Sequence, residues 1–200
     1  MLNTKIRARW DRVLRPIGAW VARGRISPNT VTLVGTALHV VVAALIVTGE
    51  LLAAGIVAVV AALLDGLDGA VAKASGKTSV FGGFLDSTTD RISDALYFAP
   101  IAWLYGVAPD DPARDEPWVA AVALVALVAS FMVSYVKARA EGLGIECNVG
   151  FAERAERLIL VILALLFEPI LPAFMVILAV LAVITVIQRI AHVYKQARLA

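Results

Sequence analysis

Four aspartates interrupt an otherwise apolar stretch of the chain. Asp65 and Asp68 stand three residues apart and Asp86 and Asp90 stand four apart, so in helices each pair shares one face and can point at a common object. Glycine and alanine accompany both pairs, which leaves room for a bound group between two helices. The spacing therefore predicts a site built from two helices.

The chemistry of these carboxylates favours a metal site. Each charged side chain deep in a bilayer costs about 2.5 to 3.5 kcal/mol, so four without compensation would cost on the order of 10 kcal/mol. Oxygen ligands suit a hard cation such as magnesium, and four negative charges balance two divalent ions. Paired ions stabilise the attacking and leaving oxygens of a phosphoryl displacement. We expect two Mg²⁺ ions, with Mn²⁺ as the alternative, on Asp65, Asp68, Asp86 and Asp90.

The same stretch resembles a known enzyme signature. It reads D-x2-D-G-x2-A-x9-G-x3-D-x3-D and is similar to the motif of the CDP-alcohol phosphotransferases, integral membrane enzymes that make phospholipids. Lys73 departs from the family pattern, in which arginine follows the alanine; lysine keeps the charge and lacks the planar fork that binds phosphate through two hydrogen bonds. The resemblance implies that Asp90 is the general base for the acceptor hydroxyl and can also be a metal ligand.

The resemblance also implies a site for CDP-diacylglycerol. The segment SPNTVT, at the start of the first apolar run, is similar to the segment that contacts the cytidine nucleotide in this family. Ser27 and Pro28 alone would also suit a plain capped helix start. The residues implied to bind CDP-diacylglycerol are Asn29, Thr30, Val31, Thr32, Gly69, Lys73 and Ser79.

Basic residues near the last three apolar segments suggest how an acceptor is bound. The fifth segment is short, which forces Arg154 and Arg157 partly into the bilayer, where an arginine needs an anionic partner. Glu153 and Glu156 could be that partner, and a substrate phosphate is the functional alternative.

Further segments make the resemblance closer. DRISD at 90–94, SYVKARAE at 134–141, ERAERLI at 153–159 and ITVIQR at 184–189 are similar to the actinobacterial phosphatidylinositol phosphate synthases. That subfamily transfers the phosphatidyl group from CDP-diacylglycerol to inositol 1-phosphate and releases CMP. The implied acceptor phosphate-binding residues are Lys137, Arg157 and Arg189. Glycerol 3-phosphate also carries a phosphate, so a phosphatidylglycerophosphate synthase is the alternative. The sequence leaves open the roles of Arg91, Asp94, Arg139 and Arg154.

Composition indicates an all-α integral membrane protein. Of 200 residues, 60% are hydrophobic, and the mean hydropathy is +0.85, above what a soluble domain of this size carries. A crossing needs about 20 residues at 1.5 Å each, so the shorter apolar runs must extend into charged positions. We expect six transmembrane helices, over 28–48, from 51 through the first aspartate pair, and over 82–107, 117–136, 151–167 and 169–188.

Basic residues set the expected orientation. Seven of them interleave with tryptophan and aliphatic residues over 2–25, which favours an interfacial amphipathic helix in 1–26 ahead of a membrane domain in 27–200, and lipid rather than nucleic acid as partner. The three loops expected on the opposite face hold only Arg114. The positive-inside rule then gives a multi-pass protein of the cell membrane with both termini and the aspartate site in the cytoplasm. The resemblance adds an actinobacterial source and a homodimer.

A cation-coupled transporter is the remote alternative from another class, because carboxylates within the membrane also make cation sites. Transporters of that kind have repeated halves and broken helices, and the sequence shows no repeat between its halves. His39 has no carboxylate near it in sequence, so we expect it to be a hydrogen-bonded packing residue.

Overall fold

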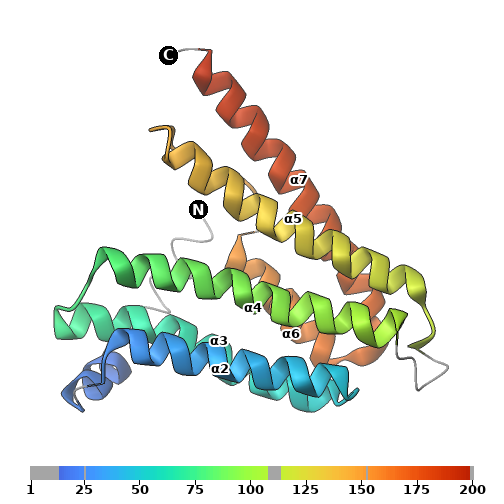
Figure 1. Ribbon diagram of the computed structural model, residues 1–200, viewed down its shortest axis with the longest axis horizontal. Coiled ribbons are helices and arrows are strands. Elements are labelled where there is room, and N and C mark those ends of the chain that lie inside the picture. The colour runs from blue at the N-terminus through green and yellow to red at the C-terminus, as the bar shows by residue number, and fades with distance from the viewer. Residues whose placement is uncertain (1–13, 25, 108–113, 152, 199–200) are drawn as a thin grey trace. The chain divides into compact units, whose positions relative to one another are not determined.

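The computed structural model describes residues 14–24, 26–107, 114–151 and 153–198, and in these ranges every regular element is a helix (Figure 1). After a helical segment at 14–23, the elements are α2 (Pro28–Val47), α3 (Leu51–Ser75), α4 (Val80–Gly106), α5 (Pro117–Glu141), α6 (Arg154–Leu166), the 3₁₀ helix η2 (Glu168–Ile170) and α7 (Leu171–Ala197). The predicted all-α fold class is confirmed.

Several helices have the length and composition to cross a membrane. Within the described residues, four such stretches are present: α2, α3, α5 and the run Glu168–Ala197. Helix α4 is not among them: it is long but carries four charged residues, in its first half and at its centre. Helix α6 has only 13 residues. The chain is a multi-pass membrane protein, and a total of six crossings stays a prediction.

Two predicted boundaries were wrong. The fifth helix begins at Arg154 rather than near Phe151, because the backbone is still extended at Glu153, with φ −69° and ψ 171°. The last helix begins at Leu171, after η2, and runs to Ala197 rather than ending at Gln188. Its final turns contain neither glycine nor proline, so nothing in their sequence stops the helix.

The chain divides into two compact units. Unit 1 consists of the described residues of Met1–Val41 and Val57–Ser93, and unit 2 of those of Val42–Ile56 and Asp94–Ala200. Helices α2, α3 and α4 each contribute residues to both units.

In unit 1 the helical segment at 14–23 packs closely on α3. A Cβ atom on Gly18 would lie 2.8 Å from the Cβ of Ala70, so only a residue without a side chain permits this approach. Trp20 on the same segment is 73% exposed. Residues 1–13 and 25 of the predicted amphipathic helix lie outside the described residues, and the 1–26 and 27–200 division stays a prediction.

Small residues also bring the helices of unit 2 together. A Cβ atom on Gly55 would lie 2.8 Å from the Leu166 side chain, and one on Gly106 would lie 2.8 Å from Ala120. Helix α5 packs on α7, with Ala182 of α7 in the buried cluster between them (Figure 1). Such contacts suit membrane helices, which associate where small residues let backbones approach.

Arg114 connects three segments of unit 2. Its Nε donates to Oε1 of Glu168 at 2.7 Å, and its Nη2 donates to the carbonyl oxygen of Gly49 at 3.2 Å. The lone basic residue of the expected opposite loops thus joins the α2–α3 connection to the segments before α5 and α7.

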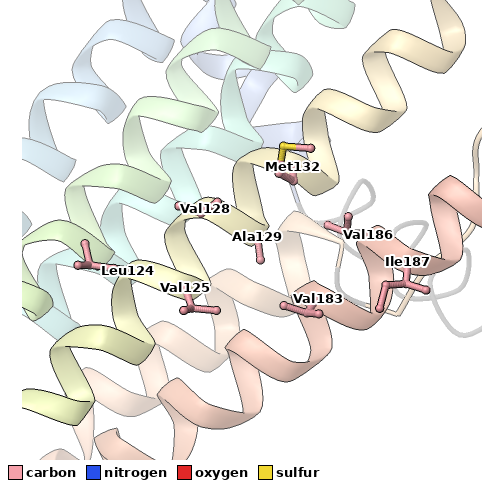
Figure 2. A pocket seen from close by; sticks show the side chains of 8 residues that line it. All are labelled: Leu124, Val125, Val128, Ala129, Met132, Val183, Val186 and Ile187. Carbon is pink, nitrogen blue, oxygen red and sulfur yellow. The ribbon is translucent and has the colours of Figure 1, made fainter.

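An apolar groove of about 440 Å³ lies between α5 and α7 (Figure 2). Its lining is Leu124, Val125, Val128, Ala129, Met132, Val183, Val186 and Ile187. Because every lining residue is apolar, this groove suits hydrocarbon. None of the predicted site residues lines it.

The α5–α6 connection offers a test of how closely its glycines pack against neighbouring side chains. Gly144 and Gly150 both have positive φ, at 78° and 123°, but a Cβ would meet nothing within 4 Å at Gly144 and would overlap the Thr185 side chain at Gly150. We expect Gly144→Ala to cost about 1 kcal/mol through backbone strain alone and Gly150→Ala about 2 to 4 kcal/mol. Thermal unfolding in detergent measures both, and equal losses would contradict the packing.

Candidate active site

The two carboxylates of α3 are held by one face of α2. Thr32 Oγ1 donates to Oδ2 of Asp68 at 2.6 Å, and His39 Nε2 lies 3.1 Å from Oδ2 of Asp65. Because an ionised carboxylate only accepts, the Nε2 of His39 carries the hydrogen. The backbone at Gly35 also comes close, since a Cβ there would lie 2.9 Å from Oδ1 of Asp65.

All four predicted carboxylates lie in unit 1. Asp68 is 7% exposed, and the charges of Asp86 and Asp65 both lie close enough to repel its own. Asp90 follows Asp86 by about one turn on α4, and one of its oxygens accepts from Nη2 of Arg91 at 3.2 Å. Carboxylate charges that act on one another in a largely apolar surrounding favour the approach of a cation.

The donor set fits a hard divalent ion in chemistry, although its side chains are directed at protein partners. Among the described residues, no three carboxylate, imidazole or thiol groups converge closely enough to hold an ion. Asp65, Asp68 and Asp90 each engage a neighbouring side chain. All their donors are oxygen, which magnesium and manganese prefer. The donor chemistry of this set therefore fits a hard divalent ion.

Residues predicted to bind the nucleotide meet where α2 and α4 begin. A Cβ on Gly82 would lie 3.1 Å from Ser79 Oγ and 3.6 Å from Asn29 Oδ1, so these two polar groups converge on the same glycine. Ser79 Oγ also accepts from the Gly82 backbone N–H at 2.9 Å and caps α4. At the start of α2 the backbone N–H of Thr30 donates to Ser27 Oγ at 3.1 Å, as the capping pattern predicts.

The remaining predicted nucleotide residues differ in their surroundings. Val31 is 6% exposed and packs with Leu67 in the hydrophobic core, and Thr32 engages Asp68. Lys73 is exposed in the last turn of α3, and a Cβ on Gly69 would meet nothing within 4 Å. The side chains of Val31 and Thr32 thus have protein partners within unit 1, whereas Lys73 is exposed and Gly69 has open space beside it.

A second polar cluster lies in unit 2. Arg157 is 2% exposed and donates from Nη2 to Oδ2 of Asp94 at 2.8 Å. Arg189 is 3% exposed and donates to the carbonyl oxygens of Val149, at 2.9 Å, and Val133, at 2.6 Å. The charge of Arg157 acts on Arg189, and both of these predicted acceptor residues are buried in unit 2.

Lys137 is placed differently from the two arginines. Its Nζ lies 3.8 Å from Oε1 of Glu141, one turn along α5, and its side chain is 36% exposed. Glu153, one of the two expected partners for the buried arginines, carries a charge that acts on Arg189. The structure pairs Arg157 with Asp94, which is neither of the expected glutamates.

Sequence reasoning missed the role of Asp94. It stands four residues after Asp90 and so continues the i, i+4 series of Asp86 and Asp90 along α4. That periodicity was the available signal. Arg91, whose role the sequence left open, engages its neighbour Asp90.

Comparison with known proteins identifies the family. A family model described as CDP-alcohol phosphatidyltransferase matches residues 25–188. The chain belongs to this family. Phosphatidyltransferases of this kind are enzymes, so the predicted transferase class is confirmed and the transporter alternative is set aside.

Named relatives of this phosphatidyltransferase come from archaea and actinobacteria. It is 40% identical over 159 residues to the archaetidylinositol phosphate synthase of Pyrococcus horikoshii, covering 79% of each chain. It is 41% identical over 156 residues to the phosphatidylinositol phosphate synthase of Mycobacterium tuberculosis H37Rv, covering 78% of this chain and 70% of that protein.

Solved structures agree with the family. A crystal structure of the M. tuberculosis phosphatidylinositol phosphate synthase with CDP-DAG bound has a TM-score of 0.81 and 36% identity, covering 92% of this chain and 94% of that one. A second, of the same enzyme in complex with manganese and citrate, has a TM-score of 0.81 and 37% identity, covering 90% and 88%. The predicted resemblance and membrane-enzyme fold are therefore confirmed.

The buried ion pair of unit 2 can be tested on its own. We expect Arg157→Ala to destabilise the protein by about 3 to 5 kcal/mol, because Asp94 stays buried without the guanidinium, and Arg157→Ala with Asp94→Ala to recover part of that loss. The exposed pair of Lys137 and Glu141 gives the control, since Lys137→Ala should cost no more than about 1 kcal/mol. Thermal unfolding measures each variant, and strictly additive losses at Arg157 and Asp94 would contradict the pairing.

Proposed function

We propose that this phosphatidyltransferase is a phosphatidylinositol phosphate synthase, which transfers the phosphatidyl group of CDP-diacylglycerol to inositol 1-phosphate and releases CMP. The observation that carries the acceptor class is the burial of two arginines, Arg157 and Arg189, in unit 2, because the planar guanidinium suits a phosphate. Relatives at about 40% identity that bear the name phosphatidylinositol phosphate synthase support the same acceptor.

The cation site belongs to the proposal. Asp65, Asp68, Asp86 and Asp90 would hold two divalent ions, Mg²⁺ or Mn²⁺, in keeping with their oxygen donors and mutual repulsion. A bound ion of this type neutralises charge on the phosphate under attack and on the leaving group. The manganese in the structure of the M. tuberculosis enzyme supports a metal of this class.

The chain's own residues then have distinct roles. Asp90 accepts the proton of the inositol hydroxyl while the hydroxyl oxygen attacks the phosphorus and the bond from phosphorus to CMP breaks. Asn29 and Ser79, which converge at Gly82, contact the nucleotide. The further nucleotide contacts in the proposal are Thr30, Val31, Thr32, Gly69 and Lys73.

The acceptor phosphate is proposed to bind Arg157 and Arg189, with Lys137 adding a third positive charge. Arginine binds phosphate through two parallel hydrogen bonds, which orients the acceptor as well as holding it. Lys137 is the more exposed of the three and acts as a flexible point charge. We further propose a homodimer whose termini and active site face the cytoplasm of an actinobacterial cell.

Asp90→Asn tests the base. The amide cannot accept the proton, so we expect CMP release to fall by about 100-fold or more while thermal unfolding is unchanged. Asp115→Asn, the same change at an exposed residue outside both polar clusters, is the matched control and should leave activity intact. Undiminished turnover of Asp90→Asn would falsify its assignment.

The acceptor is tested with purified protein in detergent, CDP-diacylglycerol and magnesium, by comparing labelled inositol 1-phosphate, free inositol and glycerol 3-phosphate. We expect lipid product from inositol 1-phosphate alone, and a large rise in its KM for Arg157→Lys and Arg189→Lys, because lysine lacks the two-pronged contact. Product from glycerol 3-phosphate instead would make the chain a phosphatidylglycerophosphate synthase and refute the inositol assignment.

A further inference from the structure

His39 is the buried residue whose role the proposed reaction leaves unexplained. We propose that His39 is a positioning residue of the cation site, whose Nε2–H holds the carboxylate of Asp65 in the orientation that binds the ion. The inference rests on the proposed function, because it takes Asp65 to be a metal ligand. It adds a residue of α2 that belongs to no motif of the aspartate stretch.

The burial of His39 calls for a specific partner. Its side chain is 0% exposed, and α2 is an apolar helix without acidic residues in its first turn or basic residues in its last. An imidazole in such a place costs free energy unless its polar atoms are paired, and an aliphatic residue would pack there without that cost. The partner is Asp65, at 3.1 Å, from the facing helix α3.

Gly35 leaves room for the same carboxylate. A Cβ at this position would lie 2.9 Å from Oδ1 of Asp65, so a larger residue would displace it, while His39 contacts Oδ2. Positions 35 and 39 are one turn apart, so both oxygens lie against a single face of α2. The bond from His39 to Oδ2 therefore sets the direction in which this carboxylate points.

Asp68 receives the equivalent support from the same face. Thr32 is 7% exposed, lies one turn before Gly35 and donates to Asp68 at 2.6 Å. Both aspartates of α3 thus receive one hydrogen bond from α2. A group that ligates a metal is commonly fixed by such an outer partner, and loss of the partner typically lowers metal affinity or activity by 10- to 100-fold.

The test measures ion binding without turnover. Mn²⁺ binding to the detergent-solubilised protein is followed by electron paramagnetic resonance, without CDP-diacylglycerol. We expect His39→Leu to weaken binding by about 10- to 100-fold and His39→Gln, whose amide N–H can still donate, to keep most of the affinity. His192→Leu is the matched control, since the chain has 2 histidines and His192 engages the Glu146 carbonyl oxygen instead.

A double-variant cycle tells positioning from general destabilisation. If His39 acts through Asp65, His39→Leu should weaken Mn²⁺ binding in the native background and have little further effect in Asp65→Asn. Equal losses in both backgrounds would overturn the inference. So would a His39→Leu protein that fails to fold while His39→Gln folds and binds no better than Asp65→Asn.

Failure of the two proposals gives different results. If Asp65→Asn and Asp68→Asn bind Mn²⁺ as tightly as the native protein, the cation site of the proposed function falls and the role of His39 falls with it. If the aspartate variants bind weakly but His39→Leu binds normally, the cation site stands and only the positioning role is overturned.

Discussion

The burial of carboxylates in a mostly apolar helical protein is the constraint on which the rest of the structure depends. Asp68 is almost completely buried, and the charges of Asp86 and Asp65 add to the cost of its own charge. The fold meets this cost locally, with one donor from α2 for each aspartate of α3. These bonds ease the burial of the charges without cancelling them, which keeps the site attractive to a cation.

Unit 2 has a different problem, because it buries two arginines. Arg157 is matched by the negative charge of Asp94, whereas Arg189 donates to two backbone carbonyl oxygens, which accept its hydrogen bonds but carry no full charge. One of these carbonyls belongs to Val149, in the irregular segment where Gly150 takes a positive φ. The other belongs to Val133 within α5, so an irregular connection and a helix each supply one acceptor.

Most of the fold and the family could be predicted from the sequence, because both depend on local spacing, whereas the roles of the four aspartates stay a prediction. Hydropathy marked the helices, and the aspartate motif marked the family. Contacts between distant positions could not be predicted. His39 and Asp65 are 26 residues apart, and Asp94 and Arg157 are 63 apart, so no periodicity relates them. The start of α6 was missed for a different reason, since the extended backbone at Glu153 leaves no mark in the hydropathy.

The two bonds from α2 also limit how unit 1 can move. Thr32 and His39 lie about two turns apart on α2 and engage Asp68 and Asp65 in antiparallel order. A slip of one residue along α2 would displace both donors by 1.5 Å and rotate them by about 100°, which would break both bonds together. Sliding and rotation are therefore blocked by the same pair of contacts. In this part of unit 1, the two hydrogen bonds therefore favour movement of α2 and α3 as one body.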